Sequence, residues 1–186
     1  AAGLSTSEYF QGVFTLSSVS YVKVQGFRFI NSVAFGAVVY KSHHIEISGN
    51  SVYNTRYSGI GVWNSRHVIV DGNDVEYAAT SGEQECISVS QSSAVQVSRN
   101  HVHNNARGGS GGDVGIDIKN GSFDVLVKAN HVHNLSTLCL YVDAYEEWTH
   151  DIVLDGNLVH DCAGIAVASE RGGLLDRVTV QNNVVF

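Results

Sequence analysis

The sequence predicts an all-β chain, folded as a right-handed single-stranded parallel β-helix with three short strands per coil and about six to seven coils. Three observations predict this solenoid. One phrase recurs with apolar residues at every second position, which is the period of a strand rather than of a helix. An Asn stands at a fixed place in that phrase. The spacing between copies varies, as expected when loops are inserted at one corner of a constant frame.

The recurring phrase has two apolar residues at alternate positions, two further residues, Asn, one residue and Val. Its first complete copy is Ile45-x-Ile47-x-x-Asn50-x-Val52. Because Asn tolerates the left-handed backbone conformation and stacked amides can hydrogen-bond, we expect the Asn at a sharp turn, in one column along the solenoid axis. The later copies place it at Asn73, Asn100, Asn130, Asn157 and Asn183.

A second apolar phrase lies between these copies, for example Gly115-Ile116-Asp117-Ile118. It supplies the first strand of each coil, the paired apolar residues supply the second, and the Val after the Asn supplies the third. Alternation turns one side chain inward at every second residue, and stacked coils then bury a continuous core. The inward column of the first strand should contain Ile60, Ile87, Ile116, Leu140 and Ile165.

Two other architectures fit less well. A helical solenoid would need a period near 3.6, and an antiparallel sandwich would show hairpin turns without a column of Asn. We therefore expect one β-helix domain over residues 1–186, a piece of a longer solenoid whose open ends are covered by further coils or by a partner chain.

Composition excludes some classes of partner. The net charge is −7, with 11 Lys and Arg against 18 Asp and Glu, which argues against nucleic-acid binding. No apolar stretch is long enough for a membrane span. The cysteines number three, and Cys86 and Cys139 should lie two coils apart, about 9.6 Å, which is too far for a bridge. We therefore expect no disulfide scaffold, and the cysteines leave the redox compartment open.

Polar side chains cluster on the outward face of the first strands, over three successive coils. Aromatic residues and a glycine-rich loop flank the cluster, and flat rings beside carboxylates suit a sugar-binding groove. The competing interpretation is a set of outward charge ladders without function. The cluster contains Asp117, Lys119, Tyr141, Asp143, Glu170 and Arg171, and the flanking residues include Trp63, Arg107, Tyr145 and Trp148.

Histidines form two outward columns on the third strand. His101 and His131 share one column, and His103, His133 and His160 share the next. Imidazoles one coil apart could converge on zinc. A ladder of like residues without function is the favoured interpretation, because no Cys or carboxylate is expected to complete a ligand shell there.

The chain resembles the right-handed parallel β-helix repeat proteins of the pectate-lyase-like superfamily. The resemblance rests on the Asn phrase, on residues 115–122 and 141–145, and on residues 169–173. It implies a secreted or cell-surface protein whose partner is a polysaccharide, with lyase, hydrolase or epimerase chemistry on uronate-containing polymers. The paired-aspartate signature of the related pectin hydrolases is missing, which favours a lyase or epimerase. A non-catalytic carbohydrate-binding or adhesive module, or a purely structural segment, remains the alternative.

Carried over by position, the resemblance implies Lys119 and Arg171 as catalytic residues, with Lys119 as the base that removes the C5 proton. The base needs a lowered pKa, which calcium bound to the adjacent carboxylates would provide. The expected cofactor is therefore calcium, with Asp117, Asp143 and Glu170 as ligands. The expected substrate-binding residues are Trp63, Arg107, Tyr141, Tyr145 and Trp148.

Overall fold

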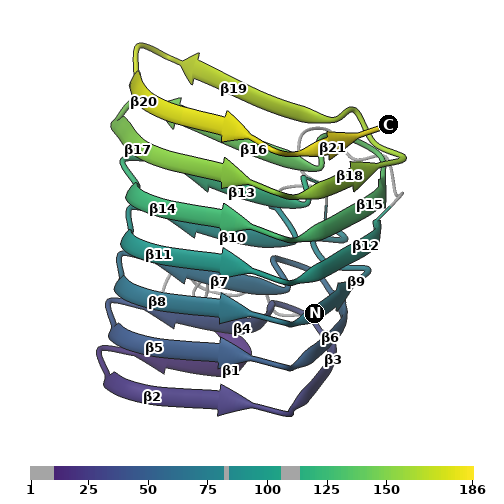
Figure 1. Ribbon diagram of the computed structural model, residues 1–186. Coiled ribbons are helices and arrows are strands. Elements are labelled where there is room, and N and C mark those ends of the chain that lie inside the picture. Colours follow the sequence, from purple (N-terminus) through teal and green to yellow (C-terminus); the bar gives the residue numbers. More distant parts are fainter. Residues whose placement is uncertain (1–10, 82–83, 106–113) are drawn as a thin grey trace.

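The computed structural model describes residues 11–81, 84–105 and 114–186, and these residues form three parallel sheets that stack coil upon coil (Figure 1). The predicted parallel β-helix is confirmed. In every sheet, each strand pairs with its counterpart from the coil before and the coil after. Within the described ranges, no helix has the length and apolar character that crossing a membrane requires.

Each sheet has seven strands. Sheet A contains β1 (Gly12–Ser17), β4 (Phe35–Tyr40), β7 (Ile60–Trp63), β10 (Ile87–Ser90), β13 (Ile116–Lys119), β16 (Leu140–Tyr145) and β19 (Ile165–Glu170). Sheet B contains β2 (Ser20–Gln25), β5 (His43–Ser48), β8 (Arg66–Asp71), β11 (Ser93–Ser98), β14 (Phe123–Lys128), β17 (Trp148–Asp155) and β20 (Leu174–Gln181). Sheet C contains β3 (Arg28–Ser32), β6 (Ser51–Thr55), β9 (Asp74–Glu76), β12 (His101–Asn105), β15 (His131–Leu135), β18 (Leu158–His160) and β21 (Val184–Val185).

The core is a stack of aliphatic side chains inside the three sheets. In sheet A, Ile116 pairs in register with Ile87 on one side and with Leu140 on the other. These side chains are buried, as predicted from their alternation. Ile165 continues the column but is only half-buried, because β19 belongs to the last coil of the sheet.

The turn between sheets B and C is built around the repeated Asn. Asn73 Nδ2 donates to Asn100 Oδ1 at 2.9 Å and to the carbonyl of Ile47 at 2.9 Å. The same pair of bonds repeats along the solenoid from Asn50 to Asn157, where the last acceptor is Asn183. Each amide therefore satisfies buried backbone groups that the turn leaves without strand partners.

The expectation that the Asn itself adopts the left-handed conformation is wrong. The residue before it does so, for example Gly49 at φ 58° and Gly72 at φ 61°. The residue with positive φ turns the chain from sheet B toward sheet C, and the amide of the Asn that follows is buried. Glycine adopts this conformation without a steric penalty, which explains its frequency in front of the Asn.

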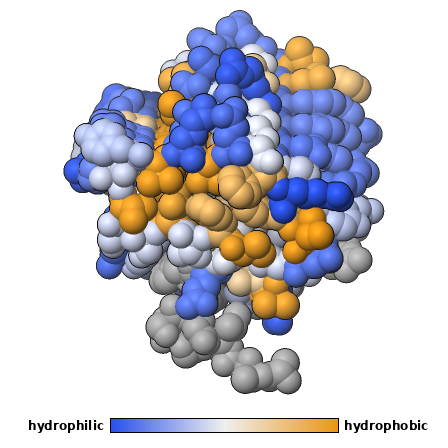
Figure 2. Space-filling model, turned by 90° about the horizontal axis from the view of Figure 1, so that it is seen from below, coloured by the Kyte–Doolittle hydropathy of each residue, from blue (hydrophilic) through white to orange (hydrophobic). Residues whose placement is uncertain are grey.

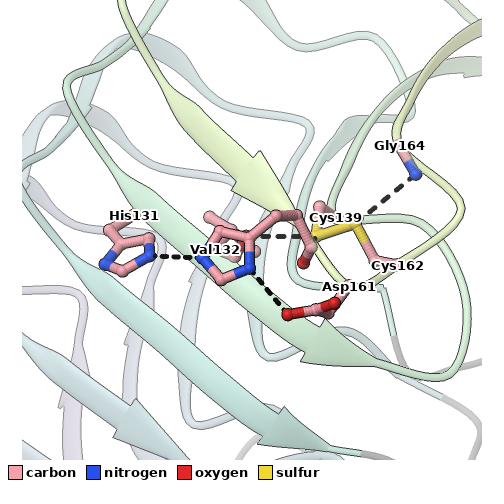
Figure 3. Close-up of a disulfide and its surroundings, with 7 residues drawn as sticks. His131, Val132, Cys139, Asp161, Cys162 and Gly164 are labelled. Carbon is pink, nitrogen blue, oxygen red and sulfur yellow. Dashed lines mark hydrogen bonds and ion pairs between the residues drawn. A yellow bond between two sulfur atoms is a disulfide. The ribbon is translucent and has the colours of Figure 1, made fainter. Parts of the chain in front are cut away.

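A disulfide joins Cys139 and Cys162, a pair that the sequence analysis did not consider (Figure 3). Cys139 directly precedes β16, and Cys162 lies between β18 and β19, in the next coil. Their Cα atoms are 5.9 Å apart, within the range a disulfide spans. The sequence argument compared Cys86 only with Cys139. Cys86 lies outside the disulfide and accepts a hydrogen bond from Asn105.

Both ends of the described solenoid are apolar. Figure 2 views the molecule from the lower end of Figure 1, where apolar side chains gather across the end of the coil stack. Val13 of β1 and Phe27, between β2 and β3, are exposed in the first coil, and Val185 and Phe186 are exposed at the opposite end. Capping by further coils or by a partner chain stays a prediction.

Candidate functional site

The strand register of sheet A brings most of the predicted polar residues onto one surface. Asp117 of β13 lies between Ser88 of β10 and Tyr141 of β16. Tyr145, at the end of β16, pairs with Glu170 at the end of β19. The outward positions assigned from the alternation of side chains are therefore neighbours in space.

Lys119 is enclosed by carboxylates. Its Nζ donates a hydrogen bond to Glu85 Oε1 and lies 3.6 Å from Asp117 Oδ2. Asp117 and Glu85 are only 1% and 6% exposed, and the Lys119 side chain is 19% exposed. One oxygen of each carboxylate, Asp117 Oδ1 and Glu85 Oε2, is buried without a hydrogen-bond partner.

A general base must be deprotonated, but this environment keeps Lys119 protonated. Burial opposes the charged amine, but the charges of Glu85 and Asp117 outweigh burial and hold the pKa of Lys119 above its usual range. Burial, reinforced by Glu85, raises the pKa of Asp117 well above its usual range. Lys119 is therefore held as a cation between two buried acids, and the geometry does not favour it as the base.

The predicted calcium ligands do not converge as they lie. Three ligands of one calcium ion must each approach within about 2.3–2.6 Å of one point. Among the described residues, the only group of at least three His, Cys, Asp or Glu whose ligand atoms lie within 4.8 Å of one another is formed by His101, His103 and His133. Asp117, Asp143 and Glu170 do not form such a group, and calcium binding by them stays a prediction.

Asp143 is a buried acid of the cluster whose pKa is raised. It is 6% exposed and accepts a hydrogen bond from the Tyr145 backbone N–H at 3.3 Å. Burial, opposed by Lys119 and reinforced by Glu170, raises the pKa of Asp143 to about 6. A carboxyl group of this kind exchanges a proton near neutral pH.

Tyr141 and Arg171 complete the cluster. The Tyr141 hydroxyl donates to Glu170 Oε1, and burial together with this bond raises the pKa of Tyr141, which keeps the phenol protonated. Arg171 is exposed, and its guanidinium lies 5.0 Å from the centre of the Tyr145 ring. The arrangement thus supplies a proton donor, a titrating carboxyl and an accessible cation on one surface.

Two predicted substrate-binding residues, Trp63 and Trp148, do not belong to this cluster. Trp63 is half-buried on β7, packs edge-on against Phe35 at 5.5 Å between ring centres, and donates to Ser88. Trp148 is 48% exposed, but it begins β17 and so lies in sheet B, where its ring contacts that of His150 at 4.0 Å. Arg107 lies outside the described residues.

Sequence reasoning missed Glu85. This residue lies in the turn before β10, whereas the predicted positions came from the first strands and from other loops. The available signal was an acidic residue directly in front of the Cys-Ile-Ser-Val phrase at residues 86–89.

A hollow on the outer face of sheet B was also missed. Its volume is about 690 Å³, and it does not lie over the titratable cluster. Tyr21, His44 and His67 line it as a ladder of rings, with centres 4.6 Å and 4.7 Å apart. Acids with raised pKa values thus lie on sheet A, whereas the hollow on sheet B presents stacked rings.

The fold and the repeat agree with a known family. A family model described as a right handed beta helix region matches residues 79–186, which is more than half of the chain. The chain belongs to this family. A search of curated proteins finds no matching sequence.

Solved structures with similar folds include the periplasmic alginate epimerase AlgG. The chain superimposes on AlgG with a TM-score of 0.64 and 16% identity, covering 90% of this chain and 47% of AlgG. Two mutants of AlgG give TM-scores of 0.69 and 0.68, with 15% and 16% identity, over 90% and 93% of this chain. The chain spans about half the length of these structures, and the likeness is one of fold.

Proposed function

We propose that this chain is a carbohydrate-acting β-helix that handles a uronate-containing polysaccharide on the outer face of sheet A, as a lyase or an epimerase. The observation that carries the proposal is the pairing of a titrating acid, Asp143, with a protonated phenol, Tyr141, on one strand. Perturbed titratable groups gather at functional sites more often than elsewhere. The fold shared with alginate epimerase supports the choice of polymer.

In this mechanism Asp143 is the base in place of Lys119. Its carboxylate accepts the C5 proton of a uronate residue, a step for which a pKa near the working pH is favourable. Tyr141 stands two residues earlier on the same strand, so the two side chains leave the same face about 6.6 Å apart. A sugar ring between them would meet a base on one side and a proton donor on the other.

Tyr141 then supplies the second proton. In an epimerase it protonates C5 from the opposite face, which inverts that centre. In a lyase the electron pair from the C5–H bond forms a C4=C5 double bond, the C4–O bond breaks, and the departing oxygen takes the phenolic proton. The Glu170 carboxylate, which accepts a hydrogen bond from Tyr141, orients the hydroxyl group.

Two charged residues have supporting roles. Arg171 is exposed and can bind the uronate carboxylate with its guanidinium group, which lowers the cost of the negative charge that develops at C5. Lys119 remains a cation and limits the rise of the pKa of Asp143. In this assignment the main effect of removing Lys119 is a loss of folding stability, because the residue takes no direct part in proton transfer.

The proposed location is outside the cytoplasm, either secreted or at the cell surface. The disulfide between Cys139 and Cys162 supports it, because disulfides persist mainly in oxidising compartments. The solved epimerase of similar fold is a periplasmic protein, which is compatible with this location.

The second candidate is a binding module without catalysis. The ring ladder of Tyr21, His44 and His67 in the sheet B hollow favours it, because stacked rings beside a shallow surface suit sugar faces. Trp148 adds an exposed ring at the start of β17 in the same sheet.

The test is a screen of pectate, alginate and glycosaminoglycans for binding and for the absorbance of an unsaturated product, with solvent exchange at C5 as the readout of epimerisation. Product or exchange from one polymer supports the enzyme. Binding without either, abolished by Tyr21→Ala and unaffected by Tyr141→Phe, overturns it in favour of the binding module. An absence of binding to every polymer contradicts both candidates.

A further inference from the structure

The histidines on the outer face of sheet C form an ordered network. His101 and His103 alternate along β12 and therefore face the same way, and His133 of β15 is the neighbour of His103 in register. His101 Nε2 lies 2.9 Å from His133 Nε2, and the His101 and His103 rings stack with centres 3.9 Å apart. Three imidazoles from two adjacent coils thus meet at one place.

A carboxylate stands behind this group, outside the set of three ligands. Asp74 of β9 precedes His101 in its column, and Asp74 Oδ1 lies 3.0 Å from His101 Nδ1 and 3.1 Å from His103 Nε2. A hydrogen bond from His101 Nδ1 to Asp74 leaves the Nε2 lone pair pointing toward His133. A carboxylate that fixes the outer nitrogen of a histidine is the usual second layer of a metal site.

We propose that His101, His103 and His133 bind a divalent transition-metal ion of the zinc type, with Asp74 as the positioning residue for His101. Their ligand atoms lie within 4.8 Å of one another. Zinc bound at about 2.0–2.1 Å by tetrahedrally arranged nitrogens separates those nitrogens by about 3.3 Å, so His101 and His133 need to part by only a few tenths of an ångström. An all-imidazole set does not suit calcium or magnesium, which prefer oxygen ligands.

Three protein ligands leave the fourth tetrahedral position open to water. The site is half-buried at the surface of sheet C, so this water would be accessible to solvent. Bound metal would also tie β12 to β15, and so join two successive coils through their outer face. The site lies on a different sheet from the polysaccharide cluster and does not depend on the function proposed for that cluster.

A neighbouring pair of histidines has a similar contact but lacks a third imidazole. His131 Nε2 lies 2.9 Å from His160 Nε2, and His160 Nδ1 lies 2.8 Å from Asp161. The same diagonal contact therefore repeats one coil further along, but this pair belongs to no group of three among the described residues. Paired histidines alone do not make the proposed site, and the third imidazole distinguishes it.

The experiment titrates zinc into chelator-treated protein in competition with a chromophoric chelator. We expect one tightly bound equivalent, binding weakened more than 100-fold in His133→Gln and in His101→Gln, and about 10–100-fold in Asp74→Asn. His44→Asn is the matched control: it alters an exposed stacked histidine with positive φ on sheet B and should leave binding unchanged.

Two further measurements separate loss of the site from loss of the fold. Far-UV circular dichroism should be the same for all variants, and zinc should raise the thermal midpoint of wild type and His44→Asn but not that of His133→Gln. The absence of a stoichiometric zinc equivalent overturns the proposal, as does equal weakening by His44→Asn or full binding by both His133→Gln and His101→Gln. Calcium in place of zinc should give no binding.

Discussion

Lys119 Nζ lies 3.6 Å from Asp117 Oδ2, in a setting where Asp117 is almost fully buried. The two residues alternate on β13 and face the same way, and Glu85 meets the amine from the turn before β10. A buried ion pair of this kind contributes less net stability than its proximity suggests, but removal of one partner leaves the other charge uncompensated. Removal of Lys119 should therefore change the free energy of unfolding by more than the net contribution of the ion pair.

Lys119→Met should destabilise the fold by about 3–5 kcal/mol, because Asp117 and Glu85 lose the cation that pairs with both of them. The loss should shrink at acidic pH, where the raised pKa of Asp117 allows it to become neutral. Urea unfolding at pH 5 and pH 8 measures both effects. Lys23→Met is the matched control, since the exposed Lys23–Glu46 pair should contribute at most about 1 kcal/mol. An equal loss of stability in the two variants would contradict the claim that buried carboxylates enclose the Lys119 amine.

Asp143→Asn should change the pH dependence of stability. The folded-state pKa of about 6 lies above the ordinary value, so wild type has the full contribution of Asp143 at low pH and loses it as pH rises through about 6. The Asn side chain of the variant does not titrate, so its stability does not fall over this pH range for this reason. Relative to its value at pH 4, its free energy of unfolding at pH 7.5 should exceed that of wild type by up to about 2–3 kcal/mol. Parallel pH profiles would mean that Asp143 titrates normally.

Reduction of the Cys139–Cys162 disulfide should lower stability by about 3 kcal/mol, because it releases a loop with a sequence separation of 23 residues in the unfolded chain. Thiol titration of unreduced, denatured protein should detect one thiol, that of Cys86, and three after reduction. Three thiols before reduction would show that the bond does not form. Cys86→Ala should leave the effect of reductant unchanged.

Ile116→Ala should cost about 2–5 kcal/mol, the range for a large aliphatic residue truncated in a packed core. Ile165→Ala removes the same atoms from the same column at a half-buried position in the last coil, so its cost should be smaller. Chemical unfolding of the two variants gives the comparison. A loss of less than about 1 kcal/mol for Ile116→Ala would contradict its place in the buried aliphatic column of sheet A.

The repeat predicts the fold well because it constrains register directly. Once Asn100 and Asn130 occupy equivalent positions, stacking aligns the remaining positions of the two coils, and Ile87 must meet Ile116. The same logic placed Asp117 beside Tyr141. Residues inside repeated phrases are thus predictable from spacing alone.

Residues at the corners are not predictable in the same way, because turn lengths differ between coils. β16 runs two residues past the point where β13 ends, and β17 begins two residues before the counterpart of Phe123, so Trp148 is already part of sheet B. The partners of Glu85 and Cys162 likewise depend on the path of a turn. Burial is a further limit: Asp117 is outward on its strand and yet almost inaccessible, which alternation cannot indicate.

The measurement that tests the central claim most directly is proton transfer at C5 of a uronate polymer in deuterated solvent. Wild type and the matched control Tyr53→Phe, an outward tyrosine of β6 in sheet C, should incorporate deuterium at C5 or release unsaturated ends. Tyr141→Phe should do so at least about 100-fold more slowly, because it lacks the proton donor. An equal rate for Tyr141→Phe, or the absence of exchange and elimination with every uronate polymer, would contradict a catalytic site on sheet A.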